Sequence, residues 1–139
     1  MFIRFQSAAP NRHGRFPGVF ALVNGLLWQG SLGSELEQWV RETNAYFDAA
    51  HTDPSTVIPD CYDPAGNPGA QSWFRAEAVE LLGRTADYLD LLDRHDVPWV
   101  ELRTKSPGRI VYQDEFQVVA VPLAHEEGWA LQYRRTKAG

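Results

Sequence analysis

The sequence predicts an α+β domain in which a small, mainly antiparallel sheet packs against three helices. Three observations predict this class. The first residues alternate between apolar and polar side chains, as strands do. The stretch from Trp99 to Val121 is rich in β-branched and aromatic residues. Between them, apolar residues recur at helical spacing. Because the helices come in one run, the N-terminal strand and the C-terminal strands should form the sheet together.

The N-terminal strand is expected at residues 1–6, where Met1, Ile3 and Phe5 fall on one face and form an apolar side. Residues 8–15 should form a loop, because proline, asparagine and glycine interrupt the pattern there. Pro17 suits the first turn of a helix, and Gly30 suits a C-terminal cap. The first helix is therefore expected between these two residues.

A second helix is predicted over residues 34–50, which carry a clear apolar face. Ser34 and Glu37 have the spacing of a capping box, in which both side chains satisfy free backbone N–H groups. The link from the first helix is short, so the two helices should form an antiparallel pair.

A third helix is expected to begin at Asn67 and Pro68, which resemble an N-cap followed by proline at the first position. It should run to about His95 with one wide apolar face. Leu81 and Leu82 lie at the centre of that face and are predicted to belong to the core.

The C-terminal part predicts several strands. One is expected at residues 99–104, followed by a turn at 106–109 in which proline precedes glycine. The next stretch, 110–121, is interrupted by Asp114–Glu115, which marks either a bulge or a turn. A last strand is expected at 129–134.

Length and composition favour one domain over residues 1–139, of which residues 123–139 could form a peripheral C-terminal extension. The net charge of −5 disfavours nucleic acid as a partner, because such binding draws on basic residues. No apolar run is long enough for a membrane span, and the N-terminus lacks the features of a signal peptide. With a lone cysteine, these features favour a cytoplasmic protein that folds without disulfide, metal or cofactor.

The segment from His51 to Asn67 is the first candidate site, because connections of this length in compact domains often form binding loops. A histidine near carboxylates could serve acid–base chemistry or bind a metal. The spacing fits no standard metal signature, and Asp-Pro and Asn-Pro pairs also suit turns, so a structural loop is the favoured alternative. The polar residues concerned are His51, Asp53, Asp60, Cys61, Tyr62 and Asp63.

Cys61 is expected to be an unreactive apolar filler, because the acidic residues beside it disfavour the thiolate. Asp114 and Glu115 are further acid–base candidates. Adjacent carboxylates in a strand point to opposite faces, so they would form a poor pair unless a bulge turned one of them. A polar hairpin tip is the favoured alternative.

A second candidate site is the cationic cluster of Arg12, His13 and Arg15, just before the helix expected at Pro17. A helix N-terminus offers free N–H groups, and arginine can bind a carboxylate or phosphate through two hydrogen bonds. This cluster predicts a site for an anionic ligand. The alternative is a solvated loop with ordinary surface arginines, since no phosphate-loop signature is present.

Four segments carry a resemblance to known proteins. They read MFIRFQS, GVFALVNGLLWQG, NPGAQSWF and PGRIVYQDEFQVVAVP. Together they resemble a group of small proteins from Streptomyces-type actinobacteria, over roughly residues 1–122. The resemblance implies a single intracellular domain, and it implies no activity, ligand or catalytic residue.

The favoured function is a non-catalytic binding or protein-interaction domain, whose partner is a protein or a small anionic ligand. The alternative is a small enzyme, a hydrolase or transferase, with a cleft between the 51–67 loop and the 112–117 segment. The two functions can be told apart by whether ionisable side chains meet in one place. An enzyme needs at least two of them in one concave pocket, whereas a binding domain needs only an exposed patch. The catalytic candidates are His51, Asp53, Asp63, Asp114 and Glu115.

Overall fold

The structure is a computed structural model that describes residues 1–123 and 131–133. These residues contain one antiparallel sheet of six strands in the order β4-β5-β2-β1-β3-β6. The predicted α+β class is confirmed, with the N-terminal strand at the centre of the sheet. The strands are β1 (Phe2–Ser7), β2 (Gln71–Arg75), β3 (Trp99–Thr104), β4 (Arg109–Gln113), β5 (Gln117–Val121) and β6 (Leu131–Tyr133).

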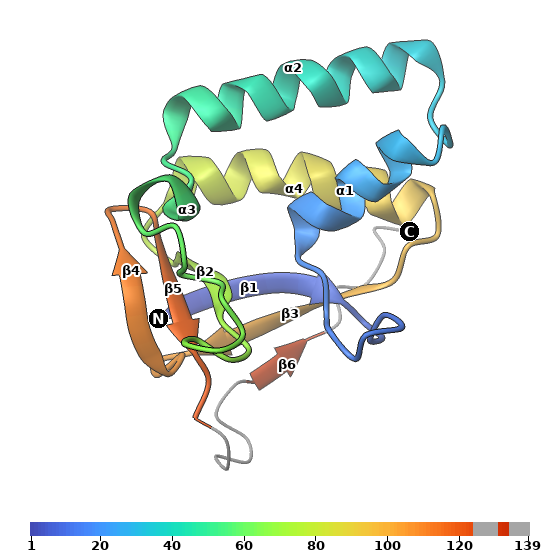
Figure 1. Ribbon diagram of the computed structural model, residues 1–139. Helices are drawn as coiled ribbons and strands as arrows, with labels where there is room; N and C mark the ends of the chain where they lie inside the picture. Colours follow the sequence, from blue (N-terminus) through green and yellow to red (C-terminus); the bar gives the residue numbers. More distant parts are fainter. Residues whose placement is uncertain (124–130, 134–139) are drawn as a thin grey trace.

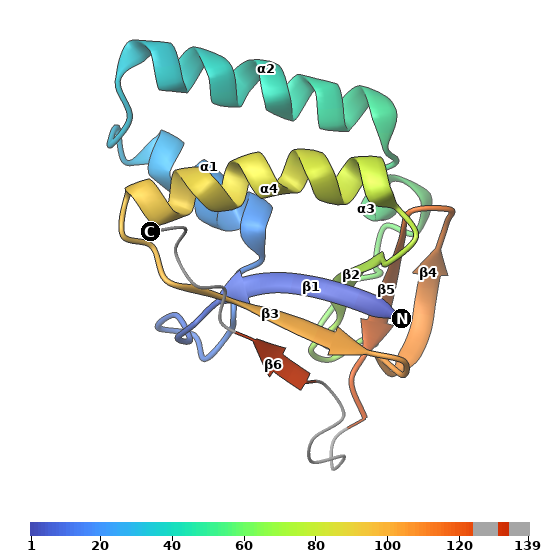
Figure 2. The same cartoon turned by 180° about the vertical axis from the view of Figure 1, so that it is seen from behind.

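The helices all lie on one face of the sheet (Figure 1). Two of them, α1 and α4, lie next to the sheet, and α2 lies across their outer side, as the reverse view also shows (Figure 2). The elements are α1 (Val19–Trp28), α2 (Ser34–Ala50), the short α3 (Pro54–Val57) and α4 (Val79–Arg94). No helix in the described part of the chain is both long and apolar enough to cross a membrane.

The predicted start of the third helix is wrong. This helix, α4, begins at Val79, and residues 71–75 form β2 instead. In β2, Phe74 pairs with Ile3 of β1 on one side and with Gln117 of β5 on the other. Pairing with strands on both edges decides the conformation of this segment, because β-structure depends on tertiary context more than on local preference.

The other helix ends differ from the predictions in smaller ways. Gly18 is the N-cap of α1, so the helix begins two residues after Pro17. Gly33 is the N-cap of α2, and no side chain caps that helix, so the predicted capping box is wrong. The helix α3 was not predicted. Asp53 caps it by accepting a hydrogen bond from the Ser55 backbone N–H, 3.0 Å away.

The C-terminal strands follow the predicted pattern, and Asp114–Glu115 lies in the turn of the β4–β5 hairpin rather than in a bulge. The register irregularity of this hairpin falls between Ile110 and Tyr112. In the turn before β4, Gly108 has a φ of 121°, and a Cβ there would overlap the Val121 carbonyl. Glycine is therefore required at this position. Strand β6 falls within the stretch predicted for the last strand, residues 129–134, of which 129, 130 and 134 lie outside the described residues.

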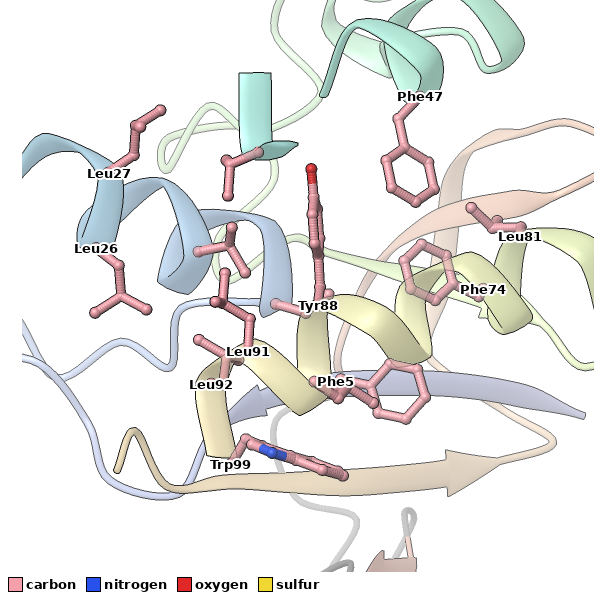
Figure 3. Packing of buried hydrophobic residues seen from close by; sticks show 14 of the residues in the cluster. Phe5, Leu26, Leu27, Phe47, Phe74, Leu81, Tyr88, Leu91, Leu92 and Trp99 are labelled. Carbon is pink, nitrogen blue, oxygen red and sulfur yellow. The ribbon is translucent and has the colours of Figure 1, made fainter. Parts of the chain in front are cut away.

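The main core lies between the helices and the sheet (Figure 3). In this view Phe47 of α2 points towards Phe74 of β2, and the ring of Tyr88 stands upright from α4 with its hydroxyl pointing away from the sheet (Figure 3). Leu81 is buried as predicted, and Leu82 is half-buried against the same cluster. The opposite face of the sheet holds a smaller cluster around Trp73, Val118 and Ala120.

Candidate functional site

A cleft of about 390 Å³ opens between α1, the C-terminal end of α2 and strand β2. Its volume falls within the usual range for small-molecule sites. The residues that line it come from widely separated parts of the chain. They are Phe20, Asn24, Asn44, Phe47, Asp48, His51, Thr52, Asp53, Pro54, Tyr62, Ser72, Phe74, Leu81 and Gln117. We call this space the central cleft.

Three phenylalanine rings form the apolar part of the central cleft. The ring centroid of Phe20 lies 5.0 Å from that of Phe47 and 5.9 Å from that of Phe74, and both pairs meet edge to face. Such pairs are favourable beyond the area they bury. Because each ring comes from a different element, the wall is fixed by the packing of α1 and α2 against β2. A flat apolar group can therefore stack against a rigid surface here.

One side of the central cleft carries two amides held in a hydrogen-bond chain. The Tyr88 hydroxyl donates to Oδ1 of Asn44, and the Asn44 amide donates to Oδ1 of Asn24 over 2.8 Å. Burial raises the pKa of the Tyr88 hydroxyl above its ordinary value, so it stays a donor at neutral pH. Each of these groups donates to the next, so the Asn24 amide N–H₂ is the donor at the end of this series of hydrogen bonds.

His51 lies at the other side, just after α2. Its Nδ1 is buried and has no hydrogen-bond partner among the described residues. The ring meets Phe116 edge to face at 4.5 Å. Burial lowers the pKa of His51 below 6.5, although Asp114 and Glu80 oppose that shift. At neutral pH His51 is therefore an uncharged imidazole, with a ring nitrogen that lacks the partner a buried polar atom normally has.

Asp53 also lines the central cleft, so two of the five catalytic candidates share it. One oxygen of Asp53 is already used, since Oδ1 accepts from both the backbone N–H and the hydroxyl of Ser55. Asp48 is the second carboxylate on the rim, and it is exposed. The rim is therefore acidic, and the described residues that line the cleft include neither lysine nor arginine.

Asp114 holds the β4–β5 turn together and does not line the central cleft. Its carboxylate accepts hydrogen bonds from the Tyr112 hydroxyl at 2.6 Å and from the backbone N–H groups of Phe116 and Gln117 at 2.8 and 3.0 Å. Burial raises the pKa of Asp114, but these hydrogen bonds outweigh it, and the pKa lies below 3.8. Glu115 is exposed in the same turn. The fold thus keeps these two carboxylates out of the lining of the central cleft, although Asp114 is near enough to His51 to oppose the lowering of its pKa.

The remaining residues of the 51–67 segment have structural positions. Asp63 is exposed and accepts from the Ala65 backbone N–H, and Asp60 is exposed beside it. Cys61 is fully buried. Burial raises the pKa of the Cys61 thiol, and the nearby Asp53 and Asp60 raise it further. The thiol therefore has the environment of an inert cysteine, with burial as the larger cause rather than the acidic neighbours.

A second, smaller cleft of about 240 Å³ adjoins the first. The two share four lining residues, Phe20, Tyr62, Ser72 and Phe74, so they lie side by side. The second cleft also includes Arg4 and the first turn of α1. Arg4 is only 8% exposed, and burial lowers its pKa to about 10, which leaves it charged at neutral pH. We call this space the Arg4 cleft.

Arg12, His13 and Arg15 are all exposed on the loop before α1, and they line neither cleft. The side chain of Asn11 shapes this loop by accepting from the backbone N–H groups of His13 and Arg15 at 2.9 and 3.0 Å. The cationic cluster thus has the geometry of a surface loop, and an anion site there stays a prediction.

Sequence reasoning missed most residues of the two clefts. Asn24 and Asn44 lie on helix faces where a polar residue carries no special signal. Arg4 did carry a signal, because an arginine stands between the apolar residues Ile3 and Phe5 of a strand. The alternation of the strand nevertheless placed its side chain on the face opposite theirs. Ser72 was missed because its strand, β2, was predicted to be part of a helix. Among the described residues, no group of three or more histidine, cysteine or acidic side chains is arranged to hold a metal ion.

No protein-family model matches this chain, and neither the curated proteins nor the solved structures compared with it show a match. The resemblance to small actinobacterial proteins stays a prediction. Function is therefore inferred from the chemistry of the two clefts.

Proposed function

We propose that the protein is a non-catalytic binding domain that holds a small organic ligand in the central cleft. The observation that carries the proposal is the buried Nδ1 of His51, which has no partner among the described residues and belongs to a side chain that lines an aromatic cleft. A buried polar atom left without a partner is costly, and a rotation of the imidazole that turned Nδ1 into the cleft would let a ligand group pair with it and recover that cost.

The lining defines the chemistry of the ligand. An apolar, preferably aromatic, body would stack against Phe20, Phe47 and Phe74, and hydrogen-bonding groups would reach His51 and the Asn24 amide. Because the rim carries Asp48 and Asp53, and no lysine or arginine among the described residues, the part of the ligand held here is neutral or cationic.

Binding is favoured over catalysis because no described residue forms an activated nucleophile in the cleft. Cys61 is fully buried with a raised pKa, and it does not line the cleft. Asp53 caps α3, and Asp114 is used by its own turn. His51 lacks the hydrogen bond that would orient a general base, since its buried Nδ1 has no partner among the described residues.

A small hydrolase or transferase is the second candidate, favoured by one observation. His51 and Asp53 line the same cleft, and Gln117 closes it from the 112–117 segment. Turnover of p-nitrophenyl acetate or p-nitrophenyl phosphate that falls on replacing His51 with alanine, but not on replacing His13, would support this candidate and count against a purely binding role.

The binding proposal can be tested with two probes, benzamide and benzamidine, which share an aromatic ring and differ in charge. In NMR titrations of the ¹⁵N-labelled protein, saturable shifts are expected at the C-terminal end of α2 and in β2, together with a change at His51 Nδ1. His51→Phe should weaken them, because Phe keeps the ring packing and removes the nitrogen. His13→Phe, at an exposed histidine, is the matched control.

Two results would count against the proposal. One is a set of shifts scattered over the surface without saturation. The other is equal binding by the wild type and His51→Phe. We infer a cytoplasmic setting for this function from the lone cysteine and the acidic composition.

A further inference from the structure

We propose that the Arg4 cleft binds an anionic group, a carboxylate or phosphate, of the same ligand, held by the Arg4 guanidinium and the first turn of α1. The inference rests on the proposed function for the rest of the ligand, because the anionic group would be the end of a molecule whose body lies in the central cleft. The anion site itself can be tested alone, with small anions that leave the central cleft empty.

The first observation is the state of the Arg4 side chain. Its Nε donates to Gln6 at 2.8 Å, Nη1 to the Ser72 carbonyl at 3.1 Å and Nη2 to the Phe16 carbonyl at 2.9 Å. All three acceptors are neutral, and Arg4 forms no ion pair with any described residue. A buried charge normally has a partner of opposite sign, because burial removes the water that would otherwise stabilise it.

Guanidinium chemistry leaves room for such a partner. Arginine has five N–H groups, and these three hydrogen bonds use one on each nitrogen. One N–H on Nη1 and one on Nη2 are therefore uncommitted among the described residues. If both point to the same side of the guanidinium, two such N–H groups can bind a carboxylate or phosphate together.

The second observation is the start of α1, which faces the same space. The first N–H groups of a helix have no acceptor within the helix, and no described side chain caps this one, although its Gly18 cap is bridged through the backbone to Gln6 of β1. The cleft is lined by Gly18, Val19, Phe20 and Ala21, the cap and first turn. The Arg4 guanidinium lies directly against the cap, since a Cβ on Gly18 would meet Nη1 at 3.3 Å. Backbone donors and the buried charge therefore border one small space.

The position of the cleft fits a ligand that spans both spaces. Tyr62 and Ser72 line both clefts and so lie at their junction. The central cleft has an acidic rim, while the Arg4 cleft has a positive charge. A ligand with an anionic group at one end and a neutral or cationic aromatic body at the other matches this division.

The competing explanation is that Arg4 is purely structural and ties β1 to β2 and to Phe16 through its three hydrogen bonds. Both explanations predict that removing the side chain destabilises the fold. They differ in whether anions bind, and in whether filling the space beside the guanidinium matters. The test therefore uses anion binding by the intact protein and a variant at Gly18.

Sodium phosphate and sodium acetate would be titrated into the ¹⁵N-labelled wild type at pH 7, with sodium chloride keeping the ionic strength constant. Saturable amide shifts are expected at Val19, Phe20 and Ala21, because an anion there accepts hydrogen bonds from this turn. Binding by acetate alone would assign a carboxylate, and binding by phosphate alone would assign a phosphate. A melting temperature that rises to a plateau should accompany the shifts.

Gly18→Ala and Gly33→Ala form a matched pair of variants. Both positions are N-caps with extended backbone, and both helices lack a side-chain cap. At Gly18 the added methyl group would crowd the guanidinium, whereas at Gly33 nothing lies within 4 Å. Anion affinity should fall by about tenfold or more in Gly18→Ala, as expected when a bidentate contact is lost, and stay at the wild-type value in Gly33→Ala.

Three outcomes would overturn the anion site. They are no saturable shifts with either anion, equal anion affinity in the two glycine variants, and loss of binding in Arg12→Ala or Arg15→Ala but not in Gly18→Ala. The last outcome would move the site to the exposed loop. If anions bind as expected but benzamide and benzamidine do not, the proposed function fails and the anion site stands.

Discussion

Replacing Tyr88 with phenylalanine isolates one hydrogen bond at the centre of the fold. The ring lies within 6 Å of three other aromatic rings, with centroid distances of 5.8 Å to Phe20, 5.7 Å to Trp39 and 5.5 Å to Phe47. Phenylalanine keeps all three contacts. The change therefore removes only the hydroxyl that donates to Asn44.

The expected loss follows from what Asn44 retains. A buried hydrogen bond contributes about 0.5–1.5 kcal/mol, and leaving a fully buried acceptor unpaired costs about 1–3 kcal/mol. Asn44 is only half-buried and borders the central cleft, so water can replace the lost donor. We therefore expect Tyr88→Phe to lower the free energy of unfolding by about 1 kcal/mol, which corresponds to roughly 2–5 °C in melting temperature.

Urea titration of the wild type, Tyr88→Phe, Asn44→Ala and the double variant would measure the loss and the coupling between the two residues. The double variant should lose less than the sum of the single ones, because each change removes the same hydrogen bond. A Tyr88→Phe variant within about 0.3 kcal/mol of the wild type, or losses that add within that margin, would refute the reasoning.

Three further predictions concern the core, the thiol and pH. Leu81→Ala should cost about 2–5 kcal/mol in urea titration, and Leu82→Ala less because its side chain is only half-buried; equal losses would contradict this placement. Cys61 should react with a thiol reagent more slowly than a free cysteine at neutral pH and become reactive in urea, because burial raises the pKa of its thiol; fast labelling of the folded protein would contradict this. His51 should titrate below 6.5 in NMR, since burial lowers its pKa. Its contribution to stability is then complete above pH 6.5 and is lost as pH falls through the lower folded value. The wild type should accordingly lose more stability than His51→Phe between about pH 7 and pH 5, and parallel losses would count against a neutral buried imidazole.

The fold was predictable where local patterns and tertiary structure agree. The alternation at β1 and the apolar face of α2 gave nearly correct bounds, because one face of each element packs against the core. Strand β2 was missed because Asn67-Pro68 has the form of a helix start, and because Phe74 and Ala78 share helical spacing. Only its partners in the sheet make this segment a strand, and they are distant in sequence.

The candidate site was predictable only in part, for a related reason. The unusual 51–67 segment drew attention to His51 and Asp53, which do line the central cleft. Whether an asparagine on a helix faces a cleft depends on how that helix packs. Arg4 is different, because its burial follows from its contact with the Ser72 carbonyl, and thus from a strand that sequence alone did not reveal.

The strand order also governs how the chain can fold during synthesis. Strand β2 lies between β1 and β5, and its pairing with β5 joins Phe74 to Gln117. Its pairing with β1 covers two residue pairs, Phe2 with Arg75 and Ile3 with Phe74. Until residues 117–121 leave the ribosome, one edge of a central strand therefore has no partner, and an open edge invites pairing with other chains. Completion of the β4–β5 hairpin, rather than formation of the helices, is then the step that protects the nascent protein from aggregation, and fragments ending before Gln117 should be the aggregation-prone ones.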